Sequence, residues 1–332
     1  MATPALDLIP LPDRTQADTG AQVEILAPAA NRAEAYARAA KAPATRKAYA
    51  SDWAHFADWC TAAAVPSLPA TPETVALYIA ALAETHRPAT ISRRMAAIAA
   101  AHKARGLESP ASMRHGAVNS VWQGIRRTLG MAQDAKAPVL IEDLRGMVRK
   151  LRPGIIGIRD RALLLVTFAG AFRRSEVVAL DFQALQFTGD GLVVTLRRSK
   201  TDQEGEGRKV GIPYGSNPDT CPVRALRAWL EASDLASGSV FRSVTRHGKI
   251  GPRMSGYAVA LVVKRYAGAV GLEPGAYSGH SLRAGLATSA AIAGASERAI
   301  MAQTGHRSSA MVRRYIRDGN LFRENAAAKV GL

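Results

Sequence analysis

Apolar residues recur at helical spacing through much of the first half of the chain. Thr45 and Thr90 are the expected N-caps of two of these runs, and another begins with Thr71 as cap and Pro72 at the first helical position. The pattern predicts a small all-helical domain over 41–130. Its helices are expected at 45–60, 71–84, 87–106 and 111–130.

Beyond residue 140 the hydrophobic period changes twice. Helical runs come first, and the apolar residues of 183–200 and 207–214 then alternate with polar ones around glycine-containing turns. Helical spacing returns from residue 221 onward. We therefore expect a second domain over 141–332, built of helices with a small antiparallel sheet, in a chain that is mainly α. Its helices are expected at 141–151, 158–171, 221–232, 255–271, 280–294, 297–303 and 310–318.

Three segments lie outside these runs. Residues 1–40 are rich in Ala, Pro and Thr without a sustained period, so we expect a flexible leader. Residues 131–140 also lack a period and are the expected linker between the two domains. Residues 320–332 are the expected C-terminal helix.

Basic residues outnumber acidic ones, with 44 Lys and Arg against 27 Asp and Glu and a formal net charge of +17. Such an excess repels itself in a compact protein unless a polyanion neutralises it, so nucleic acid is the expected partner. A membrane surface fits less well, because the basic residues are spread along the chain. The longest apolar run, 162–172, is about half of the ~20 residues that a spanning helix needs. We expect a soluble protein.

The two cysteines, Cys60 and Cys221, lie far apart and show no metal-ligand spacing. Cys60 falls on the apolar side of a helical pattern, so a packing role is expected. This cysteine usage favours a reducing cytoplasm, and no metal site is expected.

His280 and Arg283 are three residues apart at the expected start of a helix, so their side chains share one face. Backbone N–H groups at a helix start point the same way and suit a phosphate. The alternative is a capping histidine beside a solvated arginine.

Arg173 and Arg174 directly follow the most apolar helical run. Either Glu176 pairs with one of them, or one guanidinium points into a cleft as a fork for phosphate oxygens. Lys200 lies near the expected tip of a hairpin, where it is either a surface lysine or an amine delivered into a neighbouring cleft.

Tyr315 lies among Arg313, Arg314 and Arg317. A core tyrosine needs only apolar neighbours and one hydrogen-bond partner, whereas this setting suits a phosphate. A phenol with a pKa of ~10 needs positive potential and a nearby base to attack. Since residues one or two positions away do not share the tyrosine's face, a phosphate clamp would have to come from elsewhere in the chain.

The order of these residues along the chain is more specific than any one of them. The motifs GAFRRSEV, GHSLRAG and TGHRSSAMVRRYIR follow one another as R…K…HxxR…H…Y. In this order the chain resembles the tyrosine site-specific recombinases (phage integrases), in a two-domain, Cre-like form. The resemblance covers about residues 45–325. It identifies as catalytic residues Arg173, Lys200, His280, Arg283, His306 and Tyr315.

The resemblance implies a role for each of these residues. Arg173 and Arg283 would grip the non-bridging oxygens of one DNA phosphate while Tyr315 attacks it to form a 3′-phosphotyrosyl link. His280 would take and return the tyrosine proton, and Lys200 would protonate the departing 5′ oxygen. His306 would hydrogen-bond a phosphate oxygen, and Glu176 would orient the pocket. The tandem Arg173–Arg174 leaves a one-residue ambiguity, which we resolve toward Arg173 because Glu176 then lies three residues later, as in the family. No cofactor is expected.

The resemblance also implies the partners. They are double-stranded DNA with inverted-repeat core sites and further copies of the chain, two on a site and four in synapsis. The final helix would dock on a neighbouring protomer, or alternatively pack on its own domain. A bacterial or phage protein associated with the nucleoid is expected. The residues expected to contact DNA are Arg46, Lys47, Arg93, Arg94, His102, Lys103, Arg105, Arg126, Arg127, Arg174, Arg313 and Arg314.

Two other functions fit part of the pattern. A type IB topoisomerase uses similar chemistry without exchanging partner strands, although the HxxR motif favours a recombinase. A DNA-binding regulator that never cuts DNA needs only the basic charge and the helices. Only the ordered set of six residues argues against that regulator.

Overall fold

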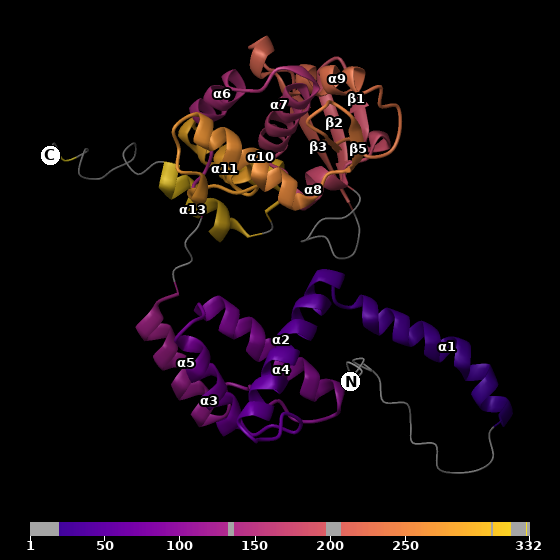
Figure 1. Ribbon diagram of the computed structural model, residues 1–332, viewed down its shortest axis with the longest axis vertical. Coiled ribbons are helices and arrows are strands. Elements are labelled where there is room, and N and C mark those ends of the chain that lie inside the picture. The colour runs from indigo at the N-terminus through magenta and orange to yellow at the C-terminus, as the bar shows by residue number, and fades with distance from the viewer. Residues whose placement is uncertain (1–19, 132–135, 197–206, 307, 320–329, 331–332) are drawn as a thin grey trace. The chain divides into compact units, whose positions relative to one another are not determined.

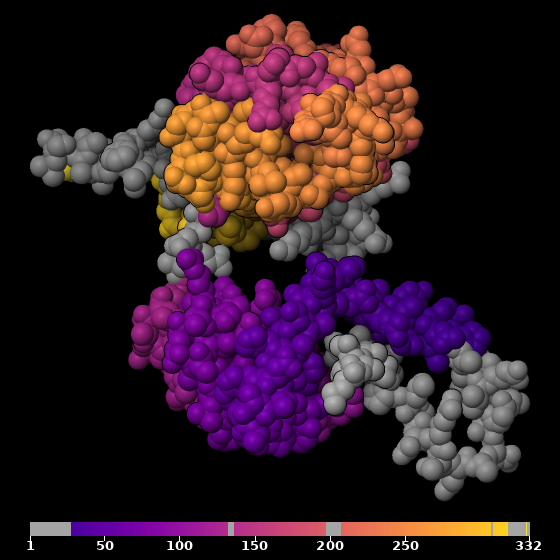
Figure 2. Space-filling model, viewed as in Figure 1, coloured from indigo at the N-terminus to yellow at the C-terminus, as the bar shows by residue number. Residues whose placement is uncertain are grey.

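The computed structural model describes residues 20–131, 136–196, 207–306, 308–319 and 330, and the chain divides into two units, Met1–Gln133 and Asp134–Leu332 (Figure 1). Each unit has its own hydrophobic core. In the space-filling view each is a compact body (Figure 2). The predicted fold class is confirmed, since the first unit is helical and the second combines helices with a small antiparallel sheet. None of the described helices is long and apolar enough to cross a membrane.

The core of the first unit forms where α2 packs on α4 and α3 packs on α5. Tyr78 is central to it, since its ring packs edge-on against both Phe56 and Trp59. The helices of this unit are α1 (Gly20–Ala39), α2 (Pro43–Ala62), α3 (Pro72–Ala83), α4 (Pro88–Ala104) and α5 (Gly116–Leu129).

Proline sets the start of three of these helices. Thr71 caps α3 as predicted, accepting a hydrogen bond from the backbone N–H of Thr74 at 3.2 Å. The predictions that Thr45 and Thr90 are N-caps are wrong, because α2 and α4 begin two residues earlier, at prolines. Proline fixes φ at a helical value and lacks the N–H that a first-turn residue would leave unpaired, so it starts the helix ahead of the threonine.

Helix α1 lies in the segment for which we expected a flexible leader. Alanine is the strongest helix former, and it makes up much of this segment. Arg38 pairs with Glu34 one turn earlier, which adds a small further stabilisation. The sequence signal was missed because alanine gives little hydrophobic period.

The second unit is built around α7, whose residues from Ala162 to Phe168 are all buried. Helix α9 packs along it, and α11 contacts it near the candidate site. Three strands form one antiparallel sheet in the order β1-β2-β3, and β4 and β5 form a separate hairpin that the sequence did not predict. The elements up to α10 are α6 (Ile141–Arg149), α7 (Gly154–Ala169), α8 (Arg174–Ala179), β1 (Leu185–Phe187), β2 (Gly191–Leu196), β3 (Arg208–Pro213), α9 (Pro222–Ala232), β4 (Arg242–Val244), β5 (Ile250–Arg253) and α10 (Gly256–Ala269).

Three helices end the described chain: α11 (Ser281–Ile292), α12 (Glu297–Thr304) and α13 (Ser309–Gly319). Helices α11 and α13 lie side by side, as the orange and yellow ribbons show (Figure 1). A small apolar cluster of Ala287, Ala291, Ile300 and Val312 joins the three. Apart from Val330, the predicted C-terminal helix 320–332 lies outside the described residues.

Candidate active site

Arg283, on the first turn of α11, is fully buried, with 0% of its surface exposed. Its Nη1 donates to the backbone carbonyl oxygen of Ala171 at 2.7 Å. Its Nε and Nη2 are also buried and have no hydrogen-bond partner among the described residues. Burial, followed by the charge of Arg173, lowers the pKa of Arg283 to about 10, so the guanidinium is still charged at neutral pH. A buried cation with two unused donors is costly unless an anion binds there.

Arg173 precedes α8 and is held by Glu176. Its Nη1 donates to one Glu176 carboxylate oxygen at 2.6 Å, and its backbone N–H donates to the other at 2.8 Å. The Arg173 side chain is 14% exposed and that of Glu176 is 3% exposed. A single buried carboxylate therefore orients this arginine by both its side chain and its backbone.

Arg174 points elsewhere. It is exposed, and the start of its side chain lies against Gly279. Arg173 is the one of the two whose charge acts on both Arg283 and His306. The structure therefore brings Arg173 and Arg283 into one site and leaves Arg174 on the surface.

His306 follows the end of α12. Gly305 ends that helix in the left-handed conformation, with φ of +67°, as the sequence predicted. Thr304 Oγ1 lies 2.7 Å from His306 Nδ1. Burial is the largest cause that lowers the pKa of His306 to about 4, and the charge of Arg283 is the next. The imidazole is therefore neutral at pH 7 and can serve as a hydrogen-bond donor or acceptor.

Tyr315 lies on α13, half-buried, with its ring centroid 5.9 Å from that of His306. Ionised, it would interact with the Arg283 charge, since it raises the pKa of that arginine. Arg313 and Arg314, the neighbours that drew attention in the sequence, are both exposed, and Arg313 pairs with Glu297 at 3.2 Å. The cations near the phenol thus come from other parts of the fold.

His280 is the N-cap of α11, one turn before Arg283. It is exposed, and its charge lowers the pKa of His306, so it lies within electrostatic range of the site. Ser278, which we expected to cap the helix, instead accepts the His280 backbone N–H through its hydroxyl at 3.2 Å. Lys200 lies outside the described residues, between the ends of β2 and β3.

The sequence analysis missed Arg208, the first residue of β3. Its Nη1 donates to the backbone carbonyl oxygen of Gln303 at 3.1 Å, and its charge acts on both Arg283 and His306. A signal was present, because in RKVGIP the strand alternation places Arg208 on the same face as the buried Val210 and Ile212.

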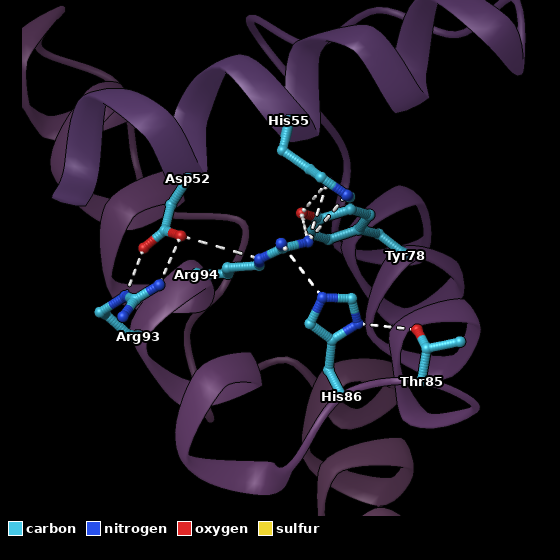
Figure 3. Close-up of polar contacts among 7 residues, drawn as sticks. All are labelled: Asp52, His55, Tyr78, Thr85, His86, Arg93 and Arg94. Carbon is cyan, nitrogen blue, oxygen red and sulfur yellow. Dashed lines mark hydrogen bonds and ion pairs between the residues drawn. The ribbon is translucent and has the colours of Figure 1, made fainter. Parts of the chain in front are cut away.

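Arg94 and His102 on α4 are buried, so our expectation that they contact DNA is wrong for this structure. Arg94 lies among three aromatic side chains: Nη1 is 3.2 Å from the Tyr78 hydroxyl and 2.9 Å from His55 Nδ1, and Nη2 is 3.3 Å from His86 Nε2 (Figure 3). It cannot leave without exposing their polar atoms.

His102 is fixed at both ring nitrogens. Its Nε2 accepts the backbone N–H of Ala70 at 3.0 Å, and its Nδ1 donates to the carbonyl oxygen of Ile98 at 2.9 Å. Both histidine nitrogens are therefore used inside the first unit. Of the other predicted contacts there, Arg46 is half-buried, and the following are exposed: Lys47, Arg93, Lys103, Arg105, Arg126 and Arg127.

Comparison with known proteins adds an independent line of argument. Residues 141–320 match the Phage integrase family. The chain is 42% identical over 291 residues to an integrase/recombinase xerD homolog of Selenomonas ruminantium, covering 86% of this chain and 85% of that protein. It is 32% identical over 156 residues to the tyrosine recombinase XerC of Pelotomaculum thermopropionicum, covering 46% of this chain and 47% of that protein.

Solved structures share the fold at low sequence identity. The XerH site-specific recombinase bound to a palindromic difH substrate, a post-cleavage complex, aligns with a TM-score of 0.61 and 14% identity, covering 78% of this chain and 72% of that one. The Tn1549 transposon integrase in complex with a circular intermediate DNA aligns with a TM-score of 0.53 and 15% identity, covering 74% and 80%.

Proposed function

Since the chain belongs to the phage integrase family and is a tyrosine recombinase of site-specific recombination, we propose that it cleaves and rejoins DNA strands through a 3′-phosphotyrosyl intermediate on Tyr315. One observation carries the proposal. Arg283 is buried with two N–H groups that have no partner among the described residues, in a site it shares with Arg173 and His306 beside the tyrosine. This is the set of donors that a DNA phosphate would satisfy.

In the cleavage step the Tyr315 oxygen forms a bond to phosphorus, and the bond from phosphorus to the 5′ oxygen breaks. Negative charge grows on the non-bridging oxygens in the transition state, where Arg173 and Arg283 donate to them. His306, neutral at pH 7, donates a hydrogen bond to the same phosphate. Because the arginines are already held by Glu176 and Ala171, little reorganisation is needed when the charge develops.

Two protons move in this step. We assign the tyrosine proton to His280 and the proton on the departing 5′ oxygen to Lys200, by resemblance to the family. Religation reverses both transfers, with a 5′ hydroxyl attacking the phosphotyrosine. The phosphotyrosyl bond keeps the energy of the phosphodiester, so the reaction needs no ATP.

Double-stranded DNA is the proposed partner of both units, since the solved XerH and Tn1549 complexes contain DNA. In the first unit the exposed cations of α4 and α5, such as Lys103 and Arg126, are the proposed phosphate contacts. Arg174, Arg313 and Arg314 are those of the second unit. Affinity should then fall with salt, with a slope of about −0.9 per neutralised phosphate.

Assembly belongs to the same proposal. Strand exchange between two sites requires four protomers, and we assign the contact between them to residues 320–332. Deleting that segment should leave cleavage of a single site intact and abolish cooperative binding to a two-copy site. If gel-shift titrations show undiminished cooperativity, that assignment is wrong.

The decisive experiment is a suicide duplex, nicked close to the cleaved bond so that the short 5′ product diffuses away. The native chain should form a covalent protein–DNA adduct, and Tyr315→Phe should bind the same duplex without forming any. Target DNA is first selected from a random pool by binding. A native chain that binds selectively but never forms an adduct would be a DNA-binding regulator instead. Relaxation of supercoiled DNA without strand exchange would indicate a topoisomerase.

A further inference from the structure

Arg208 is a cation of the candidate active site to which the proposed mechanism gives no task. It begins β3, directly opposite Leu196 at the end of β2. Strand alternation turns its side chain toward the face of the buried Val210 and Ile212, while the next residue, Lys209, is exposed on the opposite face. Arg208 therefore points into the domain and Lys209 points out.

One edge of the Arg208 guanidinium holds the segment that leads to His306. Nη1 donates to the carbonyl oxygen of Gln303, and a Cβ placed on Gly305 would lie only 2.9 Å from Arg208 Cζ, so the guanidinium lies directly against that glycine. Gln303 returns the contact, since its Nε2 donates to the carbonyl oxygen of Gly211 on β3 at 3.1 Å. These contacts fix the position of Arg208 beside His306.

The other edge has nothing to bind. Arg208 Nη2 is buried and has no hydrogen-bond partner in the part of the chain that the structure describes, as is true of Nε and Nη2 of Arg283. Burial lowers the pKa of Arg208, the charge of Glu176 raises it and that of Arg173 lowers it. Arg208 is thus close enough to interact with the same carboxylate and guanidinium that form the phosphate clamp.

Three buried N–H groups on two arginines therefore lack a partner in one region of the fold. Buried donors are almost always satisfied in folded proteins, so a shared absence at one place indicates a ligand that all of them reach. We propose, on the basis of the proposed function, that Arg208 is a further catalytic residue whose Nη2 donates to the scissile DNA phosphate, as a third guanidinium beside Arg173 and Arg283. The chemical class of ligand is a phosphodiester monoanion.

The variants that test this are Arg208→Met, which removes the charge at similar length, and Arg208→Lys, which keeps it without the two-edged fork. Lys209→Met is the matched control, because it removes one positive charge from the adjacent, exposed position of the same strand. Adduct formation is measured in a single turnover on the suicide duplex, with protein in excess so that all DNA is bound. Arg208→Met should react about 10- to 100-fold more slowly, Arg208→Lys should lie in between, and Lys209→Met should stay within about twofold of the native rate.

Three substrates separate the phosphate contact from a structural role. The first is the normal duplex, the second carries a neutral methylphosphonate at the cleaved position, and the third carries it at the adjacent phosphate. If Arg208 binds the scissile phosphate, the defect of Arg208→Met should shrink to less than about threefold on the second substrate alone, because the charge that Arg208 neutralises is missing there. If the defect shrinks only on the third, Arg208 binds the neighbouring phosphate and the proposal is wrong.

Two further outcomes overturn it. Native-like rates for Arg208→Met mean that Arg208 does not act on the reaction. An equal loss on all three substrates means that Arg208 only holds the turn at Gly305. Should Arg208→Met fail to fold, as judged by its thermal unfolding, the same three-substrate comparison is made with Arg208→Lys. If the native chain itself forms no adduct on the normal duplex, the proposed function has failed rather than the assignment of Arg208.

Discussion

Arg283 Nη1 lies 2.7 Å from the carbonyl oxygen of Ala171, a residue 112 positions earlier in the chain. Ala171 has φ of +48°, in the left-handed region that alanine rarely adopts. The strained turn after α7 thus directs a carbonyl oxygen at the guanidinium and fixes one of its edges. The remaining N–H groups of Arg283 are oriented before any ligand arrives, which is the arrangement expected of a site that stabilises developing charge.

Arg283→Met should abolish cleavage without weakening the fold. Adduct formation should fall about 10²- to 10⁴-fold, since two charge-assisted hydrogen bonds of ~1.5–3 kcal/mol each are lost. The melting temperature of the DNA-free protein should stay level or rise slightly, because a buried cation without a counter-ion is replaced by an apolar side chain. Arg145→Met, at an exposed position of α6, is the control for charge loss. A melting temperature that falls by more than a few degrees would show that Arg283 is a structural residue.

His306 should make the fold less stable in acid. Its folded pKa of about 4 lies below its ordinary value of 6.5, so the unfolded chain binds the proton more readily. Stability from this group is complete above pH 6.5 and is lost as the pH falls toward 4, with a ceiling of roughly 3 kcal/mol. Urea unfolding at pH 4.5 and pH 7 should differ less for His306→Gln than for the native chain. His247→Gln, at an exposed position, should leave the difference unchanged.

Gly305→Ala should slow cleavage more than it destabilises the protein. Gly305 and Gly294 both have positive φ, +67° and +83°, but only at Gly305 would a Cβ meet another side chain, that of Arg208. Each alanine should cost about 1 kcal/mol of stability from backbone strain. Only Gly305→Ala should also move the turn before His306, lowering the adduct rate about 10- to 100-fold. Equal rates for the two variants would contradict this reading.

Asp52→Asn should destabilise the first unit. Asp52 is 4% exposed and receives Arg93 through two hydrogen bonds of 2.7 and 3.0 Å, with Arg94 Nε 3.7 Å away (Figure 3). Its loss leaves buried Arg94 without a carboxylate, which should cost about 2–4 kcal/mol in urea unfolding. The exposed pair of Arg145 and Glu142 provides the comparison, since Glu142→Gln should cost less than about 1 kcal/mol. Equal costs would mean that Asp52 is a surface partner only.

Much of the fold could be predicted because helices and caps are local. Ser296 caps α12 and Gly305 ends it, as the sequence indicated, and the helical runs fall where the period of apolar residues placed them. The hairpin of β4 and β5 was missed because strands of three and four residues are too short to show an alternating pattern.

The candidate site was found in the sequence by the order of its motifs, and not by the surroundings of any one residue. The arginines next to Tyr315 in sequence drew attention first, yet Arg313 turns outward to Glu297, because neighbours on a helix do not share a face. The positive charge near the phenol comes from Arg283 on α11, with Arg173 and Arg208 in the same site.

The sequence by itself determined the family, the helices and the residues that carry reactive groups, since these depend on residue type and on spacing along one segment. Only the tertiary structure decided which cations are used inside the protein and which face outward. Arg94 and His102 are buried, Arg174 is exposed beside buried Arg173, and Arg208 enters the site from β3. The physical reason is that burial and charge are set by contacts between segments far apart in the chain, which no local pattern records.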